Sequence, residues 1–154
     1  MTQLSSLDNC FNFITCFDAL PSTNDYIIDL YKKSGFKNTL TVIAKQQVKG
    51  RGRMGKMWFS DGEKSLTFSF SIKLNSKINL FDINMITTLS IFQLLRAMNI
   101  SASIKYPNDI IYKKKKIAGV LIESIKIAGE SYCVVGVGLN VNNELFPENI
   151  LLDT

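Results

Sequence analysis

Apolar and polar residues alternate along several stretches of the chain, with the two-residue period of a strand. The clearest stretch spans 65–74, where polar neighbours separate five apolar side chains: Leu66, Phe68, Phe70, Ile72 and Leu74. Alternation places these side chains on one face, which indicates a half-buried strand. Shorter apolar or β-branched runs predict further strands at 11–17, 40–44, 101–106, 110–112, 117–126 and 131–141.

Two stretches carry apolar residues at helical spacing instead. The first, 25–33, follows Ser22, Thr23 and Asn24, which are typical helix-capping residues, and Gly35 ends it. The second spans 81–99. Strands outnumber helices and come with both hairpin and crossover connections. This order predicts an α+β fold, in which helices pack mainly on one side of a single mixed sheet.

Length and charge narrow the classes of protein. The 154 residues fit one domain with one core, taken here as 1–154. No apolar run approaches membrane-spanning length, and the first ten residues lack the basic start and apolar segment of a secretory signal, so no membrane partner is expected. The net charge of +5 favours anionic partners such as nucleotides, nucleic acid or an acidic protein.

Cysteine and histidine usage limits the chemistry. The three cysteines, Cys10, Cys16 and Cys133, are an odd number without CxxC spacing, which argues against a disulfide framework or a zinc site and favours the reducing cytosol. The chain has no histidine, which excludes Ser-His-Asp and Cys-His catalysis and most zinc chemistry. A reaction here must use lysine, arginine, carboxylates, amides, backbone groups or a cofactor metal.

Residues 45–61 form a long predicted loop that contains KGRGRMGKMW. Its glycines allow backbone N–H groups to approach an anion closely, and the arginine side chains match phosphate oxygens. The cationic residues are Lys49, Arg51, Arg53 and Lys56. From this loop alone, a solvated basic loop, an RNA-wrapping Arg-Gly segment and an anion-binding loop remain open.

Four shorter motifs each have a structural and a functional reading. The KYPND stretch, 105–109, is either an ordinary turn or a set of polar groups that meet nucleotide phosphate or Mg²⁺. In the KKKK run, Lys116 opens a strand and is placed to stabilise charge on an acyl phosphate, whereas the first three lysines fit a solvated turn. The GxGxN stretch, 136–140, indicates close packing or close approach to a ligand, and STN, 22–24, indicates a cap or ligand donors.

The order of these motifs carries more information than any one of them. STN, AKQQVKGRGRMGKMW, KYPNDI, KIAGVLIE and VGVGLNVN together resemble the catalytic domain of biotin protein ligases (biotin–[acetyl-CoA-carboxylase] ligase, holocarboxylase synthetase). The likeness runs from about residue 17 to 142, and GRGRxGxxW is its most specific part. The chain departs from the family pattern at Tyr106, where the family usually has Trp, and at Lys56, where Arg is common. The implied fold is the one shared with class II aminoacyl-tRNA synthetases.

The resemblance implies an ATP-dependent ligase. Such an enzyme makes biotinyl-5′-AMP from biotin and MgATP, releases pyrophosphate, and passes the biotinyl group to one lysine of a carboxylase's biotin carrier protein. The chemistry agrees with the composition, because two anionic substrates need cations rather than a histidine base. Biotin, ATP and Mg²⁺ are therefore the expected small molecules, and the biotin carboxyl carrier protein is the expected macromolecular partner.

Matching the motifs residue by residue implies the site. The expected biotin-binding residues are Ser22, Thr23, Asn24, Gln47, Arg51, Gly52, Arg53, Lys116, Gly119 and Leu121. Lys116 and Arg53 are the expected catalytic residues, with Lys116 holding the carboxylate and then the acyl-phosphate oxygens. The expected nucleotide-side residues are Arg53, Trp58, Lys105, Asn108, Asp109 and Asn140. Asp109 is also the candidate metal ligand.

The ends of the chain set further expectations. The family's N-terminal DNA-binding domain and C-terminal SH3-like barrel are both expected to be absent, so no specific DNA binding is predicted. Loss of the family's further helices could expose apolar surface, which a homodimer partner would cover. Three rival functions remain: a lipoate–protein ligase or octanoyltransferase of the same fold, a small basic RNA- or ssDNA-binding module, and a ligase relative that binds biotin without turnover.

Overall fold

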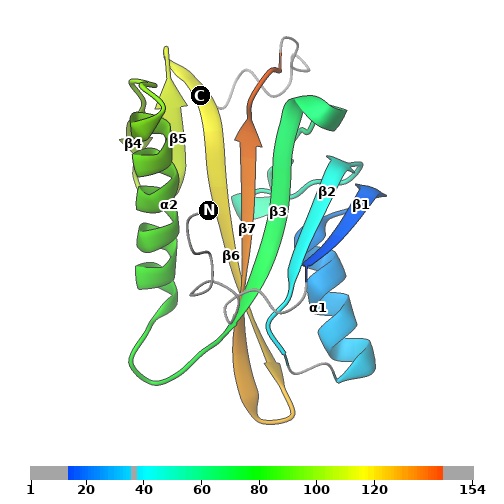
Figure 1. Ribbon diagram of the computed structural model, residues 1–154. Helices are drawn as coiled ribbons and strands as arrows, with labels where there is room; N and C mark the ends of the chain where they lie inside the picture. Colours follow the sequence, from blue (N-terminus) through cyan, green and yellow to red (C-terminus); the bar gives the residue numbers. More distant parts are fainter. Residues whose placement is uncertain (1–13, 36–37, 144–154) are drawn as a thin grey trace, which may run out of the picture.

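A computed structural model describes residues 14–35 and 38–143, and it has one seven-stranded sheet at its centre (Figure 1). The strand order is β1-β2-β3-β7-β6-β5-β4. The strands are β1 (Ile14–Leu20), β2 (Thr41–Gln47), β3 (Ser65–Lys73), β4 (Ser103–Lys105), β5 (Asp109–Tyr112), β6 (Lys115–Ile127) and β7 (Glu130–Asn140). β1 pairs parallel with β2, and the other neighbours pair antiparallel. The predicted α+β fold with a single mixed sheet is confirmed.

Two helices accompany the sheet, α1 (Thr23–Ser34) and α2 (Leu80–Ala97). Ser22 caps α1, because its Oγ accepts a hydrogen bond from the backbone N–H of Asp25, and Gly35 ends the helix with a φ of 64°. Asn79 caps α2 in the same way by accepting from the N–H of Asp82. Neither helix is long and apolar enough to cross a membrane, within the two described ranges.

The predicted boundaries need small changes. The strand expected at 11–17 runs from Ile14 to Leu20, and 11–13 lie outside the described residues. The strand expected at 101–106 is only Ser103–Lys105, because Pro107 has no N–H to pair. Lys113 and Lys114 form the β5–β6 turn with φ of 48° and 63°. The sequence predicts three lysines in this solvated turn; two form it, and the exposed Lys115 already begins β6.

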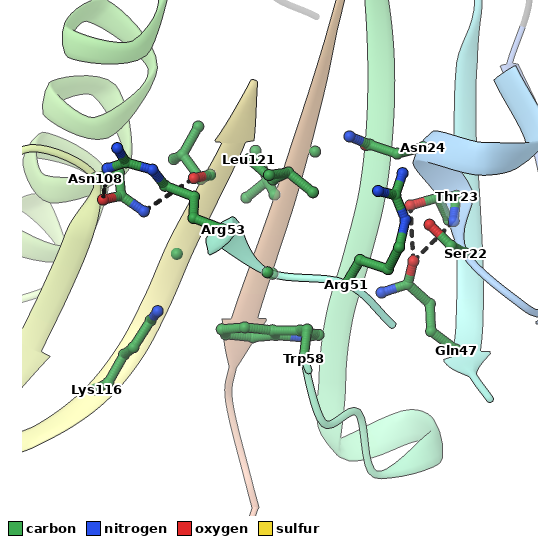
Figure 2. A pocket seen from close by; sticks show the side chains of 16 residues that line it. Ser22, Thr23, Asn24, Gln47, Arg51, Arg53, Trp58, Asn108, Lys116 and Leu121 are labelled. Carbon is green, nitrogen blue, oxygen red and sulfur yellow. Dashed lines mark hydrogen bonds between the residues drawn. The ribbon is translucent and has the colours of Figure 1, made fainter. Parts of the chain in front are cut away.

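The connection between β2 and β3 crosses the sheet and carries the basic motif. Figure 2 shows it passing in front of β7, with Arg51 and Arg53 pointing to opposite sides. It contains two short 3-10 turns, Arg53–Gly55 and Gly62–Lys64. The loop thus brings its cations over the middle of the sheet, where β6 and β7 lie side by side.

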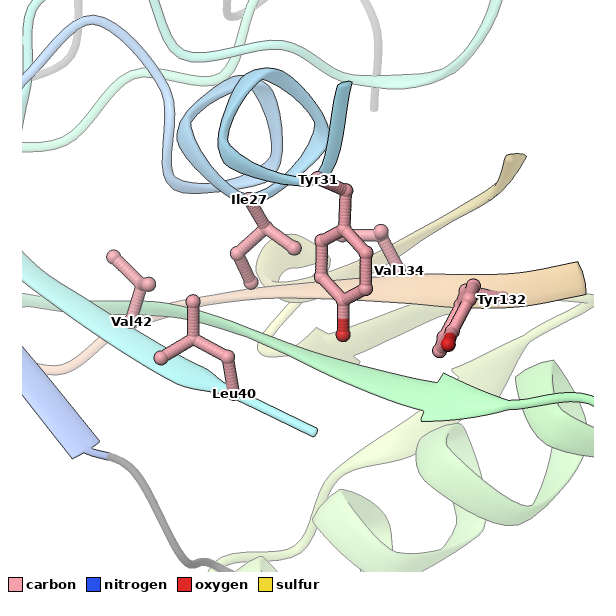
Figure 3. Packing of buried hydrophobic residues seen from close by; sticks show 6 residues of the cluster. All are labelled: Ile27, Tyr31, Leu40, Val42, Tyr132 and Val134. Atoms are coloured by element: carbon pink, nitrogen blue, oxygen red, sulfur yellow. The ribbon is translucent and has the colours of Figure 1, made fainter. Parts of the chain in front are cut away.

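The two helices lie on opposite faces of the sheet. On one face, Ile27 and Tyr31 of α1 pack with Tyr132 and Val134 of β7 (Figure 3). On the other, Ile83 of α2 packs with the alternate β7 residues Cys133, Val135 and Val137. The expectation that helices pack mainly on one side is therefore wrong. The reason lies in β7, which is buried on both faces. Its apolar residues therefore do not alternate with polar ones, and each face can be covered by a helix.

Candidate active site

A pocket lies on the α1 face of the sheet, between the start of α1, the basic loop and strands β6 and β7 (Figure 2). Its lining residues are Ser22, Thr23, Asn24, Gln47, Arg51, Gly52, Arg53, Trp58, Asn108, Lys116, Gly119, Val120, Leu121, Gly136, Val137 and Gly138. The cavity volume is about 40 Å³, enough for a few water molecules.

The start of α1 supplies one end of the pocket, named here the polar end and made of Ser22, Thr23, Asn24, Gln47 and Arg51. Thr23 donates to Gln47 Oε1 twice, from its backbone N (2.7 Å) and from Oγ1 (3.0 Å). Gln47 ends β2, and its backbone N donates to Ser60 Oγ at 2.7 Å. The N-terminal turn of a helix has free N–H groups, so this end combines donors and acceptors in a small buried space.

Asn24 is held from three directions. Its Nδ2 donates to Glu123 Oε2 at 2.8 Å, and its Oδ1 accepts from Ser69 Oγ at 2.5 Å. Beneath it, Gly136 leaves room for the amide, because a Cβ there would overlap Asn24 Oδ1. Asn24 is 2% exposed, so these contacts define its position in the pocket wall.

Arg51 lies between two carboxylates. Its Nη2 donates to both oxygens of Glu123, at 3.0 and 2.8 Å, and its Nε donates to Asp25 Oδ2 at 3.1 Å. Burial lowers the pKa of Arg51, but the hydrogen bonds and charges of Glu123 and Asp25 outweigh it, so the pKa is raised above its usual value. One guanidinium and two carboxylates give this cluster a formal charge of −1.

The basic loop folds back on itself as a small hairpin. Arg51 and Met57 form a bridge, and the N–H of Gly52 donates to the carbonyl of Lys56 at 2.7 Å. Gly50 is required for this return, because a Cβ would overlap the carbonyl of Trp58. The backbone pairing argues against a wholly solvated loop. Further ordering of the loop over a ligand stays a prediction.

The other end of the pocket, named here the cationic end, contains Arg53, Trp58, Asn108 and Lys116. Arg53 Nη1 donates to Asn108 Oδ1 at 2.7 Å, and Asn108 is fixed through Nδ2 by the Val120 carbonyl at 3.0 Å. Lys116 Nζ lies 2.9 Å from Asp109 Oδ1 and 5.6 Å from the centre of the Trp58 ring. Arg53, Lys116 and Asp109 sum to a formal charge of +1.

Trp58 lies flat over β7, and glycine makes this possible. A Cβ at Gly138 would overlap three indole atoms, and one at Gly119 would press on Lys116 and Trp58. Within the described ranges, Trp58 Nε1 and Asn140 Oδ1 are buried without a hydrogen-bond partner. Such atoms cost about 1–3 kcal/mol each when they stay unpaired, so each is an anchor point for a ligand or water.

The structure gathers most of the predicted site residues in this pocket. Three of them do not line it: Lys105, Asp109 and Asn140. Asp109 and Asn140 are nevertheless adjacent, because Asp109 pairs with Lys116 and Asn140 Nδ2 lies 3.4 Å from the Lys116 carbonyl. Lys105 is exposed on β4. The binding roles of all these residues stay predictions.

Sequence reasoning missed two residues that position Asn24. Glu123 and Ser69 hold Asn24, yet each reads as an ordinary polar position on a strand. A charged residue directly after the apolar stretch at 120–122 was the available signal for Glu123. For Gly136 and Gly138, the sequence left open either close packing or close approach to a ligand. The structure agrees with both, since each glycine packs closely against a side chain and each lines the pocket.

Asp109 is poorly arranged for a metal ion. Its Oδ1 is ion-paired with Lys116, and it also accepts from Asn108 Nδ2 at 3.0 Å. Among residues 14–35 and 38–143, no three His, Cys, Asp or Glu side chains gather as a metal centre would require. Binding of Mg²⁺ by Asp109 would first require separation from Lys116.

Comparison with known proteins identifies similar chains. Residues 16–140 match the model of the Biotin/lipoate A/B protein ligase family. The bifunctional ligase/repressor BirA of Escherichia coli is 26% identical over 141 residues, which is 90% of this chain and 43% of BirA. The human biotin–protein ligase is 30% identical over 134 residues, 82% of this chain and 18% of the human protein. The chain thus spans less than half of the length of these relatives.

Solved structures show the same similarity. A biotin protein ligase from Aquifex aeolicus, in complex with biotin and ATP, has a TM-score of 0.73 and 33% identity over 92% of this chain and 57% of that one. A biotin acetyl coenzyme A carboxylase synthetase from Helicobacter pylori, with bound biotinylated ATP, has a TM-score of 0.74 and 27% identity. The match covers 88% of this chain and 64% of that one. An archaeal lipoate protein ligase from Thermoplasma acidophilum shares the fold at 13% identity and a TM-score of 0.58.

Proposed function

The chain belongs to the biotin/lipoate A/B protein ligase family, and from this premise we propose that it is a biotin protein ligase. It forms biotinyl-5′-AMP from biotin and ATP and transfers the biotinyl group to a lysine of a biotin carboxyl carrier protein. One observation carries the proposal. The pocket joins a hydrogen-bonding end without excess positive charge to a cationic end, which suits a neutral polar ring with an anionic tail.

The polar end receives the ureido ring of biotin. This ring is uncharged and presents both N–H donors and a carbonyl acceptor, so it needs partners of both kinds. Gln47 and Asn24 have amide groups that donate and accept, and Ser22 and Thr23 add hydroxyls. Leu121 of β6 lies between the two ends (Figure 2), and Gly119 lines the pocket beside Lys116 and Trp58, so the apolar part of biotin passes over these two residues.

The cationic end holds the reacting groups. A carboxylate oxygen of biotin attacks the α-phosphorus of ATP, a P–O bond forms, and the bond to pyrophosphate breaks. Charge accumulates on the phosphoryl oxygens in this transition state, and Lys116 and Arg53 stabilise it. Mg²⁺ enters with ATP as part of that substrate and neutralises phosphate charge. Trp58 and Asn108 lie on the nucleotide side, with Asn140, Asp109 and Lys105 farther out.

Transfer follows in the same pocket. The amine of the carrier's lysine attacks the acyl carbon, an amide C–N bond forms, and AMP leaves. The amine is protonated at neutral pH, with an ordinary pKa of about 10.4, and must lose that proton on arrival. The mixed anhydride is prone to hydrolysis, so the basic loop protects it by covering the pocket.

We infer the location of the protein and its lack of specific nucleic-acid binding from the sequence and the sheet. The cytosol is the proposed location, on the odd cysteine count and the absence of CxxC spacing. Specific nucleic-acid binding is not proposed, because Phe68 and Phe70 lie on the α2 face of the sheet, opposite the basic loop, and so cannot add base stacking to its charge. A gel shift that is sequence-specific and persists at high salt would contradict this.

A homodimer is the proposed oligomer. Its support is an apolar groove of about 370 Å³ between α2 and β3, lined by residues that include Phe70, Ile72, Ile83 and Ile86. Ile86 is 63% exposed, which is unusual for a large apolar side chain beside a groove. Light scattering is expected to give twice the chain mass at micromolar concentration. A monomer mass would reject the dimer and leave the ligase proposal untouched.

A transfer assay tests the function. The protein is mixed with biotin, MgATP and a biotin carrier domain, and the carrier is analysed by mass spectrometry. We expect one biotinyl mass gain at the acceptor lysine, lost in Lys116→Ala and retained in Lys115→Ala, an exposed neighbour in the same lysine run. Lipoate with a lipoyl domain serves as the parallel substrate. Transfer of lipoate but not biotin would move the protein to the lipoate branch, and transfer of neither would reject the proposed activity.

A further inference from the structure

Glu123 contacts both Asn24 at the start of α1 and Arg51 in the basic loop. It projects from β6 with its side chain 25% exposed. Its carboxylate accepts from Asn24 Nδ2 at 2.8 Å and from Arg51 Nη2 at 3.0 and 2.8 Å. One acidic group thus holds both the helix start and the basic loop.

The contact with Asn24 decides which way its amide points. The Ser69 hydroxyl lies 2.5 Å from Oδ1 and donates there, while Glu123 can only accept and therefore selects Nδ2. With Glu123 ionised, the reversed amide would place oxygen against oxygen. The orientation presented to a ligand is consequently set from outside the pocket lining, because Glu123 itself does not line the pocket.

The contact with Arg51 sets the local charge. Asp25 and Glu123 outnumber Arg51, so the polar end together with these two neighbouring carboxylates carries a formal −1. Arg53, Lys116 and the adjacent Asp109 give the opposite end +1. A ligand with an anionic tail is repelled at the first end and attracted at the second. The sign difference therefore favours one orientation of the substrate along the pocket.

We propose that Glu123 is a positioning residue that fixes Asn24 and Arg51 and so determines the affinity and orientation of the neutral ring at the polar end. This inference rests on the proposed function, because biotin is the ligand whose ring would occupy that end. Glu123 acts through its neighbours and touches no reacting atom, so its loss should affect the ring-binding step and spare the nucleotide.

Glu123→Gln is the central variant. Glutamine keeps the size and one acceptor oxygen, but it removes the charge and places an NH₂ donor against the donors of Asn24 or Arg51. The matched control is Glu130→Gln, the same change at a glutamate with a 45% exposed side chain that pairs with Lys73 at 2.9 Å, outside the pocket lining. Asp25→Asn is the second test variant, because the Asp25 side chain contacts Arg51 and not Asn24.

Biotin binding is measured by calorimetry, with KM for biotin, KM for ATP, kcat and melting temperature for each variant. We expect Glu123→Gln to raise the biotin Kd and KM about tenfold and Asp25→Asn about threefold, estimates from the loss of one or two charge-assisted hydrogen bonds. KM for ATP should stay within twofold, and Glu130→Gln should match wild type.

Two results would overturn the inference. One is wild-type biotin affinity in Glu123→Gln. The other is an equal rise of both KM values together with a lower melting temperature, which would indicate a merely structural role. Wild-type protein that binds no biotin would instead reject the proposed function, and the role of Glu123 with it.

Discussion

At the polar end of the pocket, the side-chain atoms of Thr23 and Asn24 have protein partners. At the cationic end, Trp58 Nε1 is buried with none among the described residues, and so is Oδ1 of Asn140, which lies beside that end without lining the pocket. Hydrogen bonds from three strands, β2, β3 and β6, fix the helix start at the first end. The second end rests on one Arg–Asn bond, one Lys–Asp pair and an indole lying on glycine. The two ends therefore differ in preorganisation as well as in charge.

This difference has a physical consequence for binding. A preformed polar end loses little side-chain entropy when a ring enters, because its rotamers are already held. At the cationic end, a ligand that supplies an acceptor to Trp58 Nε1 and a donor to Asn140 Oδ1 relieves unpaired polar atoms. The first end is thus suited to selection of the ring, and the second to interactions that strengthen as charge develops during reaction.

The largest expected effect comes from Arg53→Ala at the cationic end. Removal of a preorganised cation beside the reacting phosphoryl group should lower the rate of adenylate formation by about 10²–10³-fold. Pyrophosphate release measures this step, and Lys49→Ala is the control, because it removes an exposed charge from the same loop without touching the pocket lining. Equal rates in Arg53→Ala and Lys49→Ala would remove Arg53 from the mechanism.

The next effect should come from Gly138→Ala, which places a Cβ on the indole of Trp58. Displacing a packed ring costs about 2 kcal/mol, or about 30-fold in an equilibrium constant. We expect KM for ATP to rise by about this factor while biotin affinity changes less than threefold. A larger loss of biotin than of ATP would show that the two ends are not independent.

Gly136→Ala is the matched change at the polar end, two residues along the same strand. Its Cβ would overlap the terminal amide of Asn24, which must move aside, whereas the Cβ at Gly138 meets three atoms of a rigid ring. We therefore expect a smaller effect, about tenfold on biotin affinity, from a cost of about 1.4 kcal/mol. KM for ATP is the internal control and should stay unchanged. If Gly136→Ala weakened ATP and Gly138→Ala weakened biotin, the two ends would have to be exchanged.

The smallest effect concerns Cys133, which lies on the α2 face of β7, away from the pocket. Burial raises the pKa of its thiol from 9.0 to about 11. As pH rises, unfolded molecules lose the thiol proton before folded ones do. The free energy of unfolding should therefore fall between about pH 9 and 11. Below pH 9 the thiol stays protonated in both states and does not affect it. Cys133→Val should flatten that alkaline decline in urea titrations and leave biotin binding unchanged. A decline of the same size in both proteins would assign it to other groups.

Much of the fold was predictable because several elements carry a clear period or a clear cap. The alternation at 65–74 predicts β3, and Ser22 with Gly35 predicts the limits of α1. The placement of the helices on the two faces of the sheet could not be predicted, because Tyr132 to Val137 of β7 form a continuous apolar run. A run without alternation indicates that both faces are buried but does not say which helix covers which face.

The candidate site divides in the same way. The residues in the loop and strand motifs were identifiable, since glycine and arginine spacing reflects local backbone needs and charge. Glu123 and Ser69 were not, because their importance comes from contacts 99 and 45 residues away along the chain. Long-range pairing of this kind leaves no local pattern in the sequence. Lys105 is the converse case: it belongs to a clear motif, but the fold places it outside the pocket lining.

The most direct test of the two-ended pocket is the fluorescence of Trp58, the only tryptophan in the chain, during titration with biotin. Trp58 and the basic loop both line the pocket, so a ligand that enters it changes the surroundings of the indole. We predict a saturable change in emission with biotin and a second change when MgATP follows. Emission that stays constant through both titrations, while calorimetry reports biotin binding, would contradict the account.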